Sequence, residues 1–122
     1  MSEDYASDEW ILNMFEGWFD PCPLNPDWEK NGLSPQVEWG RKTYVNPPYS
    51  DPLPWVKRAI AESKGGKMVV MLLKHDTSTR WYSLLHQAGA KFLMVSGRLK
   101  YQTRRQAAFP SILAILDGVN VK

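Results

Sequence analysis

The chain has 122 residues, of which 43% are hydrophobic and 23% are charged, and its formal net charge at pH 7 is +2. These values exclude long disorder and leave room for one modest core, so we expect a single domain over residues 1–122. The small positive charge does not by itself require a polyanionic partner, so a nucleic-acid surface would have to come from a local group of basic residues.

Membrane, disulfide and metal chemistry are not indicated by the sequence. The longest apolar run, Met68–Leu73, is far shorter than the roughly 20 residues that a membrane-spanning helix needs. Cys22 is the only cysteine, so no internal disulfide can form, and with His75 and His86 it has no metal-binding spacing. The acidic N-terminal segment lacks the charged-then-apolar pattern of a signal peptide. We therefore expect a cytoplasmic protein with no membrane and no metal partner.

The first predicted elements are a short helix and a short strand, separated by Gly17. Residues 8–16 form the helix, with Ser7 as its cap and acidic residues in its first turn. Residues 18–19 then begin the strand. Residues 20–42 are rich in proline and polar groups, so they are predicted to be mainly irregular loop.

A second strand and helix flank the most distinctive part of the sequence. Thr43–Val45 favours β-structure and stops at Asn46, because proline follows. Asp51 is predicted to cap the next helix, with Pro52 at its first position and Gly65 at its end. The apolar and charged residues of this helix fall on different sides, the charged ones being Lys57, Arg58, Glu62 and Lys64.

The rest of the chain alternates strands with one helix. Residues 67–74 form a continuous apolar run with charged ends, as in a strand buried on both faces of a parallel sheet. A helix follows, starting at Asp76 or Thr77 and ending at the next glycine, and strands are predicted over residues 91–96 and 111–116. The helical repeat places four apolar residues on the core side: Trp81, Leu84, Leu85 and Ala88.

This order of elements predicts an α/β fold with a mostly parallel sheet, in which the last two strands form a C-terminal antiparallel pair. Open sheets of this kind bind ligands beyond the carboxyl ends of their strands. Two loops lie there in this interpretation, at residues 20–23 and 46–49.

The most specific signal is the tetrad Asn46-Pro47-Pro48-Tyr49 after a predicted strand. On this tetrad the sequence resembles the amino-group methyltransferases that use S-adenosylmethionine, and most closely the phage-type DNA N-6-adenine methyltransferase family. The matching segments are Phe19–Cys22, Trp39, Tyr44–Ser50, Trp55 with Lys57, Gly97–Tyr101 and Phe109–Ser111. The resemblance implies a compact, truncated Rossmann-like methyltransferase fold. It also implies S-adenosylmethionine as cofactor, DNA as partner, and methylation of the exocyclic amino group of a flipped-out adenine.

The tetrad suits this chemistry for a physical reason. An aromatic amino group is a poor nucleophile, because its lone pair is delocalised into the ring. The Asn46 side-chain oxygen and the Pro47 backbone carbonyl can accept its two hydrogens and stabilise the growing positive charge, and the successive prolines Pro47 and Pro48 fix the direction of that carbonyl. Tyr49 offers a face on which the base stacks. The resemblance implies catalytic roles for these four residues, with no metal.

The resemblance also implies cofactor contacts, from Phe19, Asp20, Pro21, Asn31 and Asn46. Asp20 would meet the amino end of S-adenosylmethionine, although the usual glycine-rich form of this loop is missing. Asn31 stands where relatives carry an acidic residue that contacts the cofactor adenine. The ribose contact stays open between Asp27 and Glu29.

We expect nucleic-acid contacts from the tetrad region and from basic residues at strand ends, at a helix start and in a late loop. The residues are Tyr49, Ser50, Lys74, Arg80, Arg98, Lys100, Arg104 and Arg105. These basic residues would bind phosphates if they share one edge of the fold. Scattered charges in solvent are the alternative.

Several alternatives stay open at this point. The tetrad can be a proline turn between a strand and a helix, and the chain a degenerate nucleic-acid-binding module without catalysis. Methylation of a protein glutamine amide poses the same lone-pair problem and is a second enzymatic alternative. The short chain also leaves open low sequence specificity, or a homodimer that completes the site.

Overall fold

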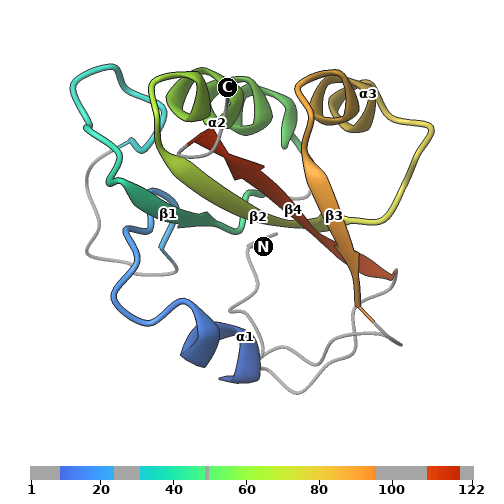
Figure 1. Cartoon of the computed structure of the whole chain (residues 1–122), viewed down its shortest axis with the longest axis horizontal. Coiled ribbons are helices and arrows are strands. Elements are labelled where there is room, and N and C mark those ends of the chain that lie inside the picture. The colour runs from blue at the N-terminus through green and yellow to red at the C-terminus, as the bar shows by residue number, and fades with distance from the viewer. Residues whose placement is uncertain (1–8, 24–30, 49, 96–109, 119–122) are drawn as a thin grey trace.

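The computed structural model describes residues 9–23, 31–48, 50–95 and 110–118. These residues form a sheet with the strand order β1-β2-β4-β3. Helices α2 and α3 lie together over one face of the sheet, and the short helix α1 lies on the other side (Figure 1). The elements are α1 (Glu9–Met14), β1 (Lys42–Val45), α2 (Leu53–Lys64), β2 (Met68–Lys74), α3 (Arg80–Gln87), β3 (Lys91–Met94) and β4 (Ser111–Asp117).

The sheet is mixed, and the prediction of a mostly parallel sheet was wrong. Strands β1 and β2 are parallel, whereas β4 is antiparallel to both of its neighbours, β2 and β3. Strand β4 returns between β2 and β3, so these two strands, which run in the same direction, never pair. The predicted antiparallel pairing of the last two strands is confirmed.

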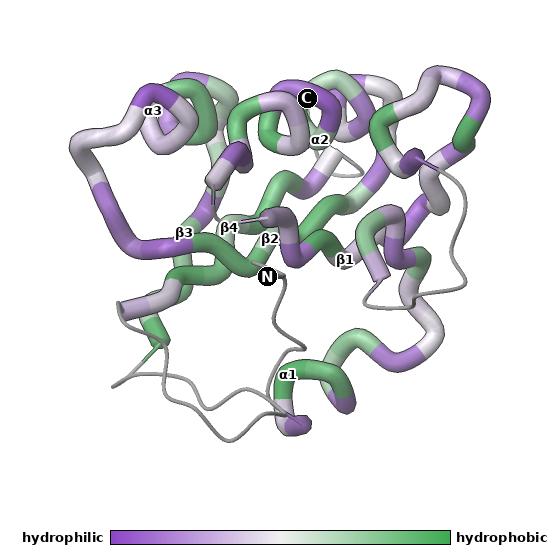
Figure 2. The backbone as a smooth tube through the Cα atoms, turned by 180° about the vertical axis from the view of Figure 1, so that it is seen from behind, coloured by the Kyte–Doolittle hydropathy of each residue, from purple (hydrophilic) through white to green (hydrophobic). Residues whose placement is uncertain are grey.

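Strand β2 is the centre of the core and is buried on both faces, as its apolar sequence predicts. Val69, Met71 and Leu73 belong to the large cluster that contains the apolar residues of α2 and α3. Val70 and Leu72 belong to a second cluster, which includes a residue of α1. Strands β2 and β4 are coloured mainly as hydrophobic in Figure 2, and they lie between the two helical sides.

The start of α2 differs from the prediction. The helix begins at Leu53, its N-cap is Pro52, and no side chain caps it, so the prediction of an Asp51 cap was wrong. Asp51 instead donates its backbone N–H to the carbonyl of Pro48, at 3.4 Å, in the turn that leaves the tetrad. Pro54 in the first turn has no N–H, which removes one of the donors that a cap would satisfy.

The start of α3 was also predicted too early. The helix begins at Arg80, after a turn in which the Asp76 carboxylate accepts the backbone N–H of Ser78 at 3.0 Å. Thr79 is the N-cap and accepts the backbone N–H of Tyr82 at 3.3 Å. Both short polar side chains bind backbone N–H groups locally, and this favours a turn and a cap over one more helical turn.

The remaining short elements lie where the sequence predicts them but differ from the prediction in length. Helix α1 lies within the predicted range, and Gly17 follows it with a positive φ of 83°. The strand predicted at residues 18–19 is reduced to one parallel bridge between Phe19 and Thr43. Strand β3 ends at Met94, while Ser7 and Ser96 lie outside the described residues.

Candidate active site

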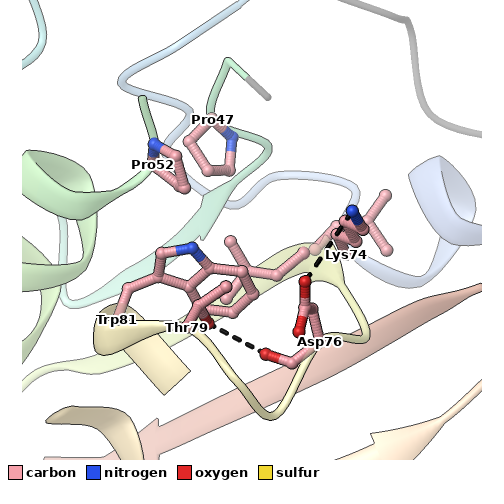
Figure 3. Close-up of a pocket in the computed structure, with 8 residues that line it drawn as sticks. Pro47, Pro52, Lys74, Asp76, Thr79 and Trp81 are labelled. Carbon is pink, nitrogen blue, oxygen red and sulfur yellow. Dashed lines mark hydrogen bonds and ion pairs between the residues drawn. The ribbon is translucent and has the colours of Figure 1, made fainter. Parts of the chain in front are cut away.

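A cavity of about 150 Å³ opens beyond the carboxyl ends of the parallel strands β1 and β2. Such an edge is where open α/β sheets commonly bind ligands. The lining residues come from the tetrad, the start of α2, the end of β2 and the turn into α3 (Figure 3): Pro47, Pro52, Leu72, Leu73, Lys74, Asp76, Thr79 and Trp81.

One part of the cavity wall is apolar. Pro47 is buried and immediately follows Asn46, which is the first residue after β1. Trp81 comes from α3 and is 8% exposed, so its indole belongs both to the core and to the cavity wall. Figure 3 shows the rings of Pro47 and Pro52 on the side of the cavity opposite Trp81. Pro47 of the tetrad and Trp81 of α3 therefore contribute the apolar part of the cavity wall, together with Pro52.

The other part of the wall is charged. Lys74 Nζ lies 3.8 Å from Asp76 Oδ2, and the lysine side chain is 50% exposed. The hydrogen bonds that Asp76 accepts from the hydroxyl and the backbone N–H of Ser78, with a smaller contribution from Lys74, lower the pKa of Asp76. The carboxylate is therefore ionised at neutral pH. The cavity thus offers hydrogen-bonding groups beside an apolar wall.

The tetrad occupies the connection between β1 and α2. Asn46 is half-buried, Pro47 is buried and Pro48 is half-buried. Ser50 is exposed, while Tyr49 lies outside the residues that the structure describes. The three tetrad residues that the structure describes, Asn46, Pro47 and Pro48, thus directly follow the end of β1, and Pro47 lines the cavity.

The residues predicted to contact the methyl donor lie at the same edge of the sheet. The Phe19 N–H donates to the Lys42 carbonyl at 3.0 Å, and the Tyr44 N–H donates to the Phe19 carbonyl at 2.9 Å. This pairing is parallel, so Asp20 and Asn46 both leave the sheet in the carboxyl direction. Burial raises the pKa of the Asp20 carboxyl, and the hydrogen bond that it accepts from the Cys22 N–H, at 2.9 Å, offsets part of this effect.

Two segments that are apart in sequence meet beside Asp20. Pro21 is fully buried, and the Gly32 backbone lies directly against it. Asn31 Oδ1 accepts the Leu33 N–H at 2.9 Å, which forms a turn around Gly32. The structure therefore brings together the four predicted cofactor contacts that lie outside the tetrad: Phe19, Asp20, Pro21 and Asn31.

Comparison with known proteins assigns this arrangement to a family. A family model described as DNA N-6-adenine-methyltransferase (Dam) matches residues 19–113. The chain belongs to this DNA N-6-adenine-methyltransferase family. The matched range begins at Phe19 and contains every residue predicted for the site.

Two curated relatives carry the same name. A DNA N-6-adenine-methyltransferase of Haemophilus phage HP1 (strain HP1c1) is 37% identical over 94 residues, which cover 66% of this chain and 54% of the relative. A DNA N-6-adenine-methyltransferase of Escherichia phage T1 is 36% identical over 63 residues, which cover 50% of this chain and 26% of the relative. The chain thus matches about half of one relative and about a quarter of the other. No solved structure matches it significantly.

The predicted DNA contacts of this methyltransferase-family chain are described only in part. Lys74 lines the cavity, and Arg80 is exposed at the start of α3, between the lining residues Thr79 and Trp81. These two basic residues therefore lie at one edge of the fold. The remaining predicted basic contacts, and the two candidates for the ribose, lie outside the described residues: Arg98, Lys100, Arg104, Arg105, Asp27 and Glu29.

Sequence reasoning missed several residues of the cavity wall, including Asp76, and one contact to the neighbouring loop. Trp81 was predicted as a core residue, which is confirmed, but its place in the cavity wall was not foreseen. Thr79 also lines the cavity, and the signal for it was its position three residues before Tyr82, the spacing of a cap. Arg58 was placed on the charged side of α2, yet it binds the loop that carries Asn31.

Within the described residues, no group of three or more His, Cys, Asp or Glu side chains is arranged to hold a metal ion. None of the described helices is long and apolar enough to cross a membrane.

Proposed function

We propose that this chain transfers a methyl group from S-adenosylmethionine to the exocyclic amino group of an adenine in DNA. The observation that carries the proposal is that Pro47, within the tetrad, lines a cavity at the carboxyl edge of β1 and β2. Membership of the DNA N-6-adenine-methyltransferase family supports the same reaction. We further propose that residues 1–122 form one methyltransferase-like domain of Rossmann-like type.

The Asp20 region fits the methyl donor. A partly buried carboxyl group whose pKa is raised by desolvation gains from a nearby cation, because the cation stabilises the charged form. The ammonium group of S-adenosylmethionine is such a cation, and the half-buried Phe19 provides apolar surface beside it. Asn31 lies on the adjoining segment, where it would contact the donor's adenine. When bound, S-adenosylmethionine supplies the electrophilic methyl group.

The tetrad would activate the target amino group. The Asn46 side-chain oxygen and the Pro47 carbonyl accept its two hydrogens, which directs the nitrogen lone pair toward the methyl group. The Pro47–Pro48 peptide has no N–H, and the ring of Pro48 restricts ψ of Pro47, which sets the direction of the Pro47 carbonyl. No strong general base is needed before attack, because the amino group reacts as a neutral nucleophile. The nitrogen–methyl bond would form as the sulfur–methyl bond breaks, the donor would leave as a neutral thioether, and the methylated nitrogen would then lose one proton to water.

The cavity would receive the flipped adenine. Flipping a base costs a few kcal/mol, and stacking on an aromatic residue returns about 1–3 kcal/mol. We assign this stacking role to Tyr49 and the apolar wall to Pro47 and Trp81. Lys74, Ser50 and Arg80, together with the basic residues 98–105, would contact the DNA backbone, where phosphate binding is salt-dependent.

The test is transfer of a labelled methyl group from S-adenosylmethionine to DNA, with recovery of methyladenine. Asn46→Ala is expected to abolish transfer while leaving the unfolding temperature nearly unchanged. Asn13→Ala, an exposed asparagine of α1, is the matched control and is expected to retain activity. Full activity of Asn46→Ala would contradict the assigned role. Labelling of protein glutamine in place of DNA, or a folded wild-type chain with no transfer and no saturable donor binding, would contradict the function.

A further inference from the structure

Arg58 makes an unusually complete set of contacts for a charged helix residue. It lies in α2, and its side chain is 17% exposed. Its Nη1 donates to the carbonyls of Leu33 and Ser34 at 3.3 and 3.0 Å, and its Nη2 donates to the carbonyl of Val37 at 2.6 Å. All three acceptors are backbone atoms of one loop, so Arg58 ties α2 to that loop.

The loop has few regular hydrogen bonds of its own. Two backbone hydrogen bonds within it are local, from the Ser34 N–H to the Asn31 carbonyl at 2.8 Å and from the Val37 N–H to the Ser34 carbonyl at 3.0 Å. The guanidinium also lies 5.0 Å from the centre of the Trp39 ring, at the end of the same loop. A planar cation with several fixed donors can bind the three carbonyls and face the ring at once, which a lysine ammonium cannot.

The contacts continue from Arg58 toward the candidate cofactor residues. Trp39 Nε1 donates to the Gly32 carbonyl at 2.8 Å. Gly32 lies against the carbonyl of Pro21, with no room for a side chain. A continuous series of contacts therefore runs from Arg58 in α2, through Trp39 and Gly32, to Pro21 beside Asp20.

A carboxylate on the next helical turn orients Arg58. Glu62 Oε2 accepts from Arg58 Nε at 2.7 Å, and Glu62 Oε1 accepts from Lys67 Nζ at 2.6 Å. Lys67 precedes β2, and the N–H of the following residue, Met68, donates to the Arg41 carbonyl at 2.8 Å. Glu62 thus binds the Nε of Arg58, while Nη1 and Nη2 donate to the carbonyls of the loop.

We propose that Arg58 is a positioning residue for the methyl-donor site: it holds the loop of residues 31–39 against α2 and so places Asn31, and through the Gly32–Pro21 contact the neighbouring Asp20, for S-adenosylmethionine. This inference rests on the proposed function, because the donor is S-adenosylmethionine only if that proposal holds. Arg58 itself acts through the loop and need not touch the donor or the adenine.

The test compares the wild-type chain with Arg58→Lys, which keeps the charge and most of the stem. Binding of S-adenosylmethionine is measured by calorimetry, and amide hydrogen exchange is measured without any ligand. We expect Arg58→Lys to weaken donor binding about tenfold and to speed exchange in residues 31–39, with β2 and β4 unchanged. In methyl transfer, KM for the donor should rise while kcat changes less than about threefold.

Lys64→Gln is the matched control, because it removes an exposed charge from the same helix. It should leave donor binding and loop exchange unchanged. Unaffected donor binding in Arg58→Lys would overturn the inference alone. Faster exchange throughout the sheet would also overturn it, because Arg58 would then be a general structural residue. A folded wild-type chain that binds no S-adenosylmethionine would overturn the proposed function and this inference with it.

Discussion

Gly32 lies against the backbone of Pro21, so closely that a Cβ atom at position 32 would stand 1.9 Å from the Pro21 carbonyl oxygen. No real Cβ contact is that short, and the obstacle is backbone, which cannot rotate away as a flexible side chain can. The two segments proposed to bind the methyl donor are therefore packed through main chain at this point. Any side chain at position 32 must separate them.

Gly32→Ala should consequently impair donor binding. The backbone shift should cost about 1–3 kcal/mol of the free energy of unfolding and weaken S-adenosylmethionine binding more than tenfold. Gly17→Ala is the control, since Gly17 has a positive φ but open space around its Cα. It should cost about 1–2 kcal/mol through backbone strain alone and leave donor binding intact. Equal donor affinities of the two variants, measured by calorimetry, would argue against close packing at Gly32.

Asp20→Asn should stabilise the fold while weakening the site. Burial raises the pKa of Asp20 above its usual 3.8, so the folded chain binds more protons than the unfolded chain just above that pH. Stability contributed by this group therefore falls as pH rises through the window between the two pKa values, and at pH 7 the ionised carboxylate destabilises the fold.

The amide removes this destabilisation and keeps an oxygen for the Cys22 N–H. We expect a higher unfolding temperature than wild type at pH 7, and a difference that shrinks as pH falls toward 3.8. Donor affinity should drop about tenfold through loss of the charged partner. The exposed Asp51→Asn provides the comparison for removal of a surface charge. A lower unfolding temperature for Asp20→Asn at pH 7 would show that the carboxylate is stabilising, contrary to this account.

Trp81→Phe should alter substrate use beyond its effect on stability. The smaller ring should cost about 1–2 kcal/mol of folding free energy and loosen the cavity wall, so KM for DNA should rise several-fold. Leu85→Val lies one turn along α3, is fully buried and does not line the cavity. It should cost a similar free energy without raising KM for DNA. KM for DNA is measured at a temperature where both variants are folded. An equal change of KM in Trp81→Phe and Leu85→Val would contradict the role of Trp81.

Glu62→Gln should lower the free energy of unfolding at neutral pH and make it less dependent on pH in the acid range. Burial tends to raise the pKa of Glu62, but the hydrogen bonds and charges of Lys67 and Arg58 outweigh it and lower that pKa below the usual 4.5. The stabilisation is therefore fully present above pH 4.5 and is lost as pH falls through the folded pKa.

We expect Glu62→Gln to lose about 1 kcal/mol in urea unfolding at pH 7 and less at pH 3. Glu38→Gln, an exposed glutamate, should lose almost nothing at either pH. A loss for Glu62→Gln that is as large at pH 3 as at pH 7 would mean that ionisation of Glu62 is not its cause.

The sequence by itself determined the local features of this protein. The tetrad and its place after a β-favouring triplet are readable, because proline restricts the residue before it and ends the strand. The burial of β2, and of Trp81 and Leu85 in α3, follows from hydrophobic patterns within one element. Ala88, which the same pattern placed on the core side, is exposed because the helix ends before it. The resemblance carried by the tetrad led to the family that the comparison with known proteins confirms. The strand end and the burial patterns depend on neighbours within a few residues.

Only the tertiary structure decided how distant segments meet. Strand β4 lies between β2 and β3, and this order depends on pairing across long stretches of chain that no local pattern encodes. Arg58 binds carbonyls 21 to 25 residues away, and nothing in its own helix distinguishes it from an exposed cation. Trp81 satisfies the core pattern equally well whether or not a cavity lies beside it. Burial follows from local periodicity, whereas the partner of a buried group depends on how the whole chain packs.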